Sequence, residues 1–318
     1  ATGFTTRTQV WYNTYNGSSW AGPVRISDYA GMGGQHQRYC SIAVDGSDNL
    51  HVVWDGQATG FITGNQIWYN KYSGGAWAGP DRISDYAGMQ SYDQLQAGIA
   101  VDSNDDLHVV WGGKATATNN QIWYNKYNGS WAGPVRISDY TGMENHPQGG
   151  PAIAIDSNDY IHVVWYGLAT GFISHSQIWY NKYDSAWIGP VRISTYLGMD
   201  VSFDQNFPSV AADATNAVHI VWYGKATGYT GTDRIWYAKY VTSWSTPEVL
   251  QTMGTDLSSP NLRWSRYPSS NIPAAGADYV FFDGTNIYWD LKDKPFPAGM
   301  RGLNPALLEV LGYGSGSI

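Results

Sequence analysis

The stretch "NLHVVWDGQATGFITGNQIWYNKY", which runs from Asn49 to Tyr72, decides the fold because the chain repeats it. Close copies span residues 106–127 and 160–183, and a looser copy spans 217–240. A catalytic motif is normally written once, so a phrase in several copies indicates either a scaffold or a multiplied binding surface. Self-similarity at a fixed period is typical of repeat architectures.

Tryptophans mark the period of this repeat. The 318 residues contain 16 Trp, and 14 of them fall into three series whose members recur every 54 to 57 residues. The first series is Trp54, Trp111, Trp165 and Trp222, the second is Trp11, Trp68, Trp123, Trp179 and Trp236, and the third is Trp20, Trp77, Trp131, Trp187 and Trp244. The aromatic excess is therefore a property of the repeat.

Each unit predicts four short strands. In one copy these are "SIAVD" (Ser41–Asp45), "LHVVW" (Leu50–Trp54), "QIWYNKY" (Gln66–Tyr72) and "DRIS" (Asp81–Ser84), all bounded by Gly, Asp, Asn or Pro. No segment of the repeat has a helical period. Four-stranded units of this length, repeated several times, predict an all-β fold, the β-propeller.

The strand count favours six blades, with five as the alternative. We expect a propeller over residues 1–290 and a C-terminal extension over 291–318. The expected units are 1–40 (partial), 41–96, 97–150, 151–207, 208–258 and 259–290 (partial). In the extension, "LNPALLEVLG" (303–312) predicts a short helix, with Pro at its first turn and Gly at its end. The chain has no initiator Met, so we expect a removed leader or a fragment.

Composition excludes several classes of protein. The net charge of −8, without a run of Lys or Arg, argues against a nucleic-acid partner. No apolar run is long enough for a membrane-spanning helix. A single cysteine excludes an internal disulfide and a cysteine-based zinc site. The repeated acids lack the spacing of an EF-hand, so structural calcium is not indicated and we expect no cofactor.

The segment "PAIAIDSNDYIHVVWYG…QIWYNKYDSAWIGPVRIS", residues 151–194, resembles a blade of the sialidase-like Asp-box propellers. The resemblance extends from about residue 2 to residue 290 and implies the propeller architecture. The Asp-box turn itself is degraded, because only Asp184 keeps an acid there. Sialidase chemistry also needs an arginine cluster that cannot be assembled from this sequence, so no catalytic residues are carried over.

Long Gly-rich loops should emerge on one face of the ring and tight turns on the other. Because binding residues are usually carried on loops, we expect the face with the long loops to be the functional one. On that face "ATGF" or a close variant recurs, with "ATAT" (115–118) as the exception. An aromatic ring beside a hydroxyl can stack on a sugar, or it can fill the gap between blades. The candidate ligand-binding residues are Thr59, Phe61, Thr170, Phe172, Thr227 and Tyr229.

The same loops carry acids, histidines and an arginine that do not repeat. Two carboxylates at a suitable separation suffice for a glycosidase, and a histidine could serve a lyase as base. These alternative enzyme candidates are Asp93, Glu144, His146, Asp200, Asp204, His36 and Arg38. The four histidines that do repeat, at the start of the second strand, are expected to be structural.

The likeness of the repeats favours a secreted or surface-exposed propeller that binds glycans or a polymeric surface at several equivalent sites, without catalysis. The first alternative is a glycoside hydrolase or polysaccharide lyase that uses the non-repeated loop residues. The second is a structural module of a surface filament, appendage or virion, which assembles with itself or with a protein partner through residues 291–318.

Overall fold

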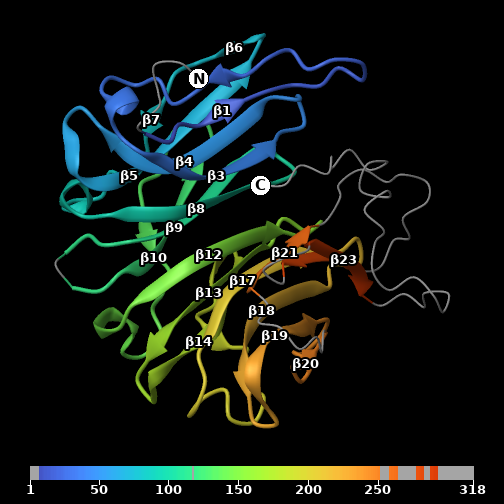
Figure 1. Ribbon diagram of the computed structural model, residues 1–318. Coiled ribbons are helices and arrows are strands. Elements are labelled where there is room, and N and C mark those ends of the chain that lie inside the picture. Colours follow the sequence, from blue (N-terminus) through green and yellow to red (C-terminus); the bar gives the residue numbers. More distant parts are fainter. Residues whose placement is uncertain (1–6, 117, 251–257, 264–276, 283–286, 293–318) are drawn as a thin grey trace.

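Figure 1 shows the computed structural model of the chain, which is built from antiparallel sheets arranged around an axis. It describes residues 7–116, 118–250, 258–263, 277–282 and 287–292. Strands and turns make up nearly all of these residues, and their only helices are three single 3₁₀ turns. The predicted all-β propeller fold is therefore confirmed. The expected helix at 303–312 lies outside the described residues.

Four sheets are complete blades, and two are partial. The first blade contains β3 (Gln37–Val44), β4 (Leu50–Ala58), β5 (Phe61–Ser73), β6 (Ala76–Trp77) and β7 (Asp81–Arg82). The second contains β8 (Gln94–Val101), β9 (Leu107–Gly113), β10 (Gln121–Tyr127) and β11 (Val135–Arg136). The third contains β12 (Gln148–Ile155), β13 (Ile161–Ala169), β14 (Phe172–Asp184), β15 (Ala186–Trp187) and β16 (Val191–Arg192). The fourth contains β17 (Gln205–Ala212), β18 (Val218–Ala226), β19 (Tyr229–Tyr240) and β20 (Glu248–Val249).

The partial sheets lie at the two ends of the described chain. One is β1 (Trp11–Tyr12) with β2 (Val24–Arg25), and the other is β21 (Ser258–Arg263), β22 (Ala277–Phe282) and β23 (Ile287–Lys292). The inner strands β3, β8, β12, β17 and β21 follow one another around the axis, each next to the one before (Figure 1). With five inner strands in the described residues, the blade count is about five, and the preference for six is corrected.

Tryptophans of the first two series hold each blade together. Trp54 on β4 stands directly opposite Trp68 on β5, and both indoles are fully buried. The Trp54 indole N–H donates to Gln37 Oε1 at 2.9 Å, and the Trp68 indole N–H donates to the Gly56 carbonyl at 2.9 Å. The other complete blades repeat this pairing and its register. Buried indoles with satisfied N–H groups provide much of the packing that a blade needs.

The third tryptophan series joins neighbouring blades. Trp131 of the second blade packs edge-on against Tyr69 of the first, with ring centroids 5.2 Å apart. The same contact joins the second blade to the third and the third to the fourth. Each blade thus buries a face against the next, which a single four-stranded sheet could not do alone.

Repeated histidines and aspartates fix the tight turns. His51 bonds the Tyr69 hydroxyl through Nδ1 at 2.8 Å and the Asp45 carboxylate through Nε2 at 3.0 Å. Asp45 Oδ1 also accepts the backbone N–H groups of Ser47 and Asn49. The other complete blades place a histidine, an aspartate and a tyrosine in the same arrangement. These imidazoles are buried structural groups, away from the loops that carry the non-repeated residues.

Candidate functional site

Every complete blade carries a β-bulge near the start of its inner strand. The pairing register shifts between Arg38 and Ser41 in β3, and equivalent shifts interrupt β8, β12 and β17. At each bulge one residue has positive φ: Tyr39 (49°), Gln96 (58°), Gly150 (55°) and Phe207 (46°). Such a conformation is strained for residues other than Gly, and bulges are common next to active sites because they re-aim side chains.

A second position differs from blade to blade beside these bulges. It is the residue after the tryptophan of the second strand: Asp55, Gly112, Tyr166 and Tyr223. The strands around it are nearly identical, so these four residues depart from an otherwise repeated pattern. At the bulge and at this position, each blade therefore presents a different side chain near the axis.

Aromatic rings from the two variable positions pack together in the third and fourth blades. The Phe207 ring stacks on Tyr223 with centroids 5.7 Å apart and contacts Tyr166 at 5.2 Å. Only glycine fits at position 150, because a Cβ there would approach the Tyr166 ring to 2.6 Å. Burial raises the pKa of Tyr166, so its hydroxyl stays protonated and can donate a hydrogen bond.

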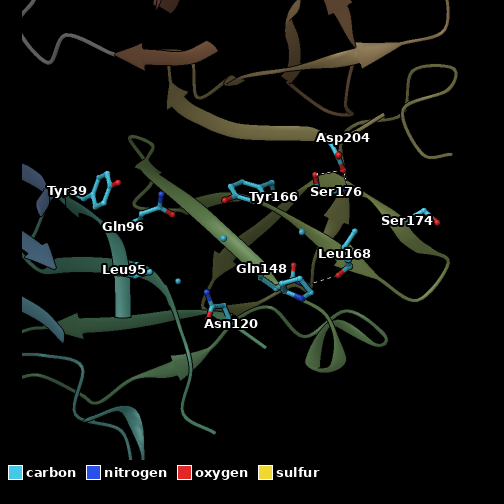
Figure 2. Close-up of a pocket in the computed structure, with 14 residues that line it drawn as sticks. Tyr39, Leu95, Gln96, Asn120, Gln148, Tyr166, Leu168, Ser174, Ser176 and Asp204 are labelled. Carbon is cyan, nitrogen blue, oxygen red and sulfur yellow. Dashed lines mark hydrogen bonds between the residues drawn. The ribbon is translucent and has the colours of Figure 1, made fainter. Parts of the chain in front are cut away.

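A cavity of about 480 Å³ opens at these ends of the inner strands. Figure 2 shows Tyr39, Gln96 and Tyr166 along it, with Ser176 and Asp204 at one end. The lining comes from the inner strands β3, β8 and β12, from β9, β13 and β14, and from neighbouring loops, so all four complete blades or the loops that lead into them contribute. A volume of this size falls in the range of small-molecule sites, and its mixture of aromatic and polar groups suits a sugar.

Asp55 is a buried carboxyl that lies behind the cavity lining and bonds one of its residues. It is 1% exposed, and its Oδ1 accepts the backbone N–H of Gln96, a cavity-lining residue of the next blade, at 3.1 Å. Its Oδ2 has no hydrogen-bond partner among the described residues. Burial raises the pKa of Asp55 to about 7, so this carboxyl holds a proton near neutral pH.

Two charged neighbours act on Asp55 in opposite directions. The negative charge of Asp93 raises the pKa of Asp55, whereas the positive charge of Arg38 lowers it. Arg38 stands directly opposite Asp55 in the β3–β4 ladder. Asp93 accepts the backbone N–H of Asn65 at 2.8 Å, which fixes its carboxylate in the same neighbourhood. A carboxyl with a raised pKa beside a second acid is an arrangement typical of acid–base sites.

Asp204 supplies a carboxylate at one end of the cavity. It accepts the Ser176 backbone N–H at 2.7 Å and the Ser176 hydroxyl at 3.1 Å (Figure 2). His175 Nδ1 lies 3.7 Å from the same oxygen of Asp204. Asp204 is exposed, so a bound molecule can reach it.

The alternative enzyme candidates divide into two groups. Asp93, Arg38 and Asp204 gather at or beside the cavity. The others lie elsewhere: Asp200 is 3.9 Å from Arg192, and His146 contributes its carbonyl to Gln121 and Gln148. Glu144 lines a separate hollow.

His36, the remaining alternative candidate, is held by Thr8. Its Nδ1 lies 3.2 Å from the Thr8 amide and 3.0 Å from the Thr8 hydroxyl. Local desolvation lowers the pKa of His36, and the charges of Arg38 and Arg7 lower it further. The imidazole is therefore neutral near pH 7, with Nδ1 accepting the Thr8 amide and the proton on Nε2.

The repeated "ATGF" residues make packing contacts. Phe61 lies edge-on to Trp68 at 5.8 Å, under the Arg82 guanidinium at 4.6 Å. The backbone N–H of Thr59 donates to the Ala30 carbonyl at 2.9 Å. Phe172 and Tyr229 pack as Phe61 does, and Thr170 and Thr227 bond as Thr59 does. These contacts place the residues in the seams of the scaffold, and their expected role in ligand binding stays a prediction.

Two features bear on metals and membranes. Within the described ranges, no group of three or more His, Cys, Asp or Glu side chains is placed to hold a metal ion. The same residues include no helix of the length and apolar character that would cross a bilayer.

Comparison with known proteins finds similarity at the level of structure alone. No protein-family model matches the sequence, and no curated protein matches it. The fold is similar to the alpha-L-arabinanase of Penicillium chrysogenum complexed with arabinobiose, with a TM-score of 0.59 and 13% identity over 80% of this chain and 77% of that one. It is also similar to the alpha-L-arabinofuranosidase of Fusarium graminearum, with a TM-score of 0.58 and 12% identity over 82% of each chain. A polysaccharide lyase described as an ulvan lyase gives a TM-score of 0.59 and 10% identity over 85% of this chain and 72% of that one.

These findings correct the main functional expectation. The expectation of multivalent binding without catalysis is wrong, because the similar structures are two glycoside hydrolases and a polysaccharide lyase, which favours the enzyme alternative. At 10 to 13% identity the similarity itself shows the fold. The physical reason for the error is that likeness of the repeats reflects the packing of blades, while the cavity lining also contains residues that differ between blades, such as Tyr39 and Tyr166.

Sequence reasoning missed Asp55 and Tyr166. Both follow the tryptophan of "HVVW" or its variant, and a signal was present, because the residue after this tryptophan changes while the phrase before it does not. The bulge residues Tyr39, Gln96 and Phe207 also vary from blade to blade. They precede the expected first strands and read as loop.

Proposed function

We propose that this protein is a carbohydrate-active enzyme that cleaves a glycosidic bond of a polysaccharide or oligosaccharide bound in the axial cavity. The observation that carries the proposal is the buried carboxyl of Asp55, whose pKa is raised to about 7 and which bonds a residue of the cavity lining. The polysaccharide-cleaving relatives of the same fold support it. The proposal includes two further statements: the chain is related to the sialidase-like repeat family, and the protein is secreted or exposed on a surface.

The primary candidate reaction is hydrolysis. Glycosidases use one carboxylic acid to protonate the leaving oxygen and a second carboxylate to activate water or attack the sugar. Asp55 has the raised pKa that the acid requires. Asp204, an exposed carboxyl that lines the cavity, is assigned the second role, with Ser176 holding it in place. Tyr39 and Tyr166 offer aromatic faces for the sugar rings.

A second candidate, β-elimination of a uronate polymer, rests on the pair His36 and Arg38. A lyase needs a neutral base and a cation next to the substrate carboxylate. The lowered pKa of His36 provides the first, and Arg38 beside Asp55 provides the second. In that reaction the bond from Thr8 to His36 would open, His36 Nδ1 would take the C5 proton, the C4–O bond would break to leave a C4=C5 double bond, and Asp55 would protonate the leaving oxygen.

One experiment tests both reactions. The purified protein is incubated with arabinan, xylan, polygalacturonate and ulvan, and the products are assayed for new reducing ends and for ultraviolet absorbance of unsaturated uronates. Reducing ends without absorbance identify a hydrolase, and both signals together identify a lyase. In either case Asp55→Asn is expected to lower the rate by about 10² to 10⁴, the usual contribution of a general acid.

The matched control is Asp159→Asn. Asp159 lies in a tight turn, where it accepts the Ser103 amide and hydroxyl, and the fourth blade uses Asn216 for the same contacts. This variant makes the same chemical change at a position where the chain already uses Asn, so its activity should equal that of the wild type. Equal activity of the Asp55 and Asp159 variants would refute the assignment of Asp55.

A further inference from the structure

The second blade lacks one of the repeated aromatic contacts. In the other three complete blades a ring from the second hairpin covers a buried tryptophan: Phe61 on Trp68, Phe172 on Trp179 and Tyr229 on Trp236, at 5.8, 5.9 and 5.4 Å. The second blade has "ATATNN" (115–120) where the first has "ATGFITGN" (58–65). Its hairpin is two residues shorter and lacks the aromatic residue.

A hollow of about 550 Å³ lies at this place. Its floor contains Trp123, the counterpart of Trp68, and Tyr86, whose ring lies 5.2 Å from the Trp123 ring. Trp123 is 6% exposed, whereas Trp179 and Trp236 are fully covered. The rim is polar and includes Asn119 and Glu144. The missing phenylalanine has therefore left a ring-sized space over an aromatic floor.

The arginine of this hollow has lost its partners as well. In the first blade Arg82 donates to Gln66 Oε1 and to the Ser84 carbonyl while its guanidinium covers Phe61. Arg192 does the same in the third blade. Arg136 is the counterpart in the second blade, lines the hollow and is exposed. Among the described residues its side chain makes no hydrogen bond, ion pair or ring contact.

The hollow adjoins the axial cavity. Asn119 lines the hollow and the next residue, Asn120, lines the cavity, so the shortened hairpin separates the two. A sugar chain bound in the cavity can therefore continue outward across the second blade.

We propose that this hollow binds a uronic acid ring of the same polysaccharide. The C–H face of the pyranose would stack on the exposed ring of Tyr86, beside the edge of Trp123, and its carboxylate would form a bidentate pair with Arg136. Asn119 can donate to the sugar hydroxyls. Glu144, whose Oε1 accepts the Asn145 side-chain amide at 3.2 Å, can accept from them. The proposal rests on the proposed function for the identity of the polymer, but binding here needs no catalysis.

Binding is measured by saturation-transfer NMR with the methyl glucuronide and galacturonide and, as the neutral comparison, the methyl glucoside. At least one uronide is expected to bind the wild-type protein and the Asp55→Asn variant equally, and to bind more tightly than the glucoside. Arg136→Gln should weaken uronide binding about tenfold, because it removes a charge-assisted pair.

The decisive variant replaces residues 115–120 with the first-blade sequence "ATGFITGN". Neighbouring blades already fold with this hairpin, so the graft should fill the hollow with a phenylalanine and abolish uronide binding while leaving the thermal transition cooperative. Unchanged binding in the graft, equal affinity for glucoside and uronide, or no binding of either uronide would overturn the proposal. An active Asp55→Asn variant would refute the catalytic role of Asp55 and leave this site standing.

Discussion

Asp55 makes the stability of the protein depend on pH in a direction that can be calculated. Its pKa rises from the ordinary value of 3.8 to about 7 because the carboxyl is buried. Between these two pH values the folded protein keeps a proton that the unfolded chain has released. Stability therefore falls as pH rises through this window and is constant, for this group, above it.

The magnitude follows from the size of the shift. Each pKa unit is worth about 1.4 kcal/mol, so the change from 3.8 to about 7 destabilises the folded protein by about 4 kcal/mol at pH 8 relative to pH 4. Asparagine has the shape of the protonated acid and does not ionise. The free energy of unfolding of Asp55→Asn, measured against the wild type, should therefore rise by about 4 kcal/mol across the same range.

Urea unfolding followed by tryptophan fluorescence at pH 4, 6 and 8 gives this difference. Comparing the two proteins at each pH removes the contributions of all other titrating groups. A further variant, Asp93→Asn, removes the neighbouring charge that raises the pKa of Asp55, so its pH window should shift to lower pH. A difference between wild type and Asp55→Asn that stays constant within about 1 kcal/mol would refute the raised pKa and, with it, the proposed proton donor.

Three further predictions concern the scaffold. Phe172→Ala should lower the free energy of unfolding by about 2 to 4 kcal/mol in urea titrations, because it removes a ring that packs on Trp179, without changing the cleavage rate of the folded protein. His108→Ala should cost about 2 to 4 kcal/mol, since it leaves a buried carboxylate and a buried tyrosine hydroxyl without their common partner, and calorimetry would show it as a lowered Tm. Asp159→Asn should change stability by less than about 0.5 kcal/mol in the same measurement, because Asn216 already fills the equivalent place.

The local pattern of the sequence determined the blades. The paired tryptophans, the alternating Val and Ile and the Gly- or Asn-containing turns each act within about 20 residues of chain, so their spacing alone predicts strands, hairpins and the all-β propeller. The direct pairing of Trp54 with Trp68 follows from the hairpin that joins them. The number of blades did not follow, because it depends on how the ends of the chain meet around the axis.

Tertiary structure decided the candidate site. Asp55 and Gln96 are 41 residues apart and belong to different blades, and only the packing of β3 and β4 against β8 brings them to a 3.1 Å contact. The raised pKa of Asp55 comes from desolvation by that packing, which no local pattern records. The bulges at Tyr39 and Phe207 likewise form only within the completed sheets. The sequence therefore determined the repeated framework by itself, and the packing of successive blades decided which non-repeated side chains meet, because burial and proximity are properties of the assembled blades.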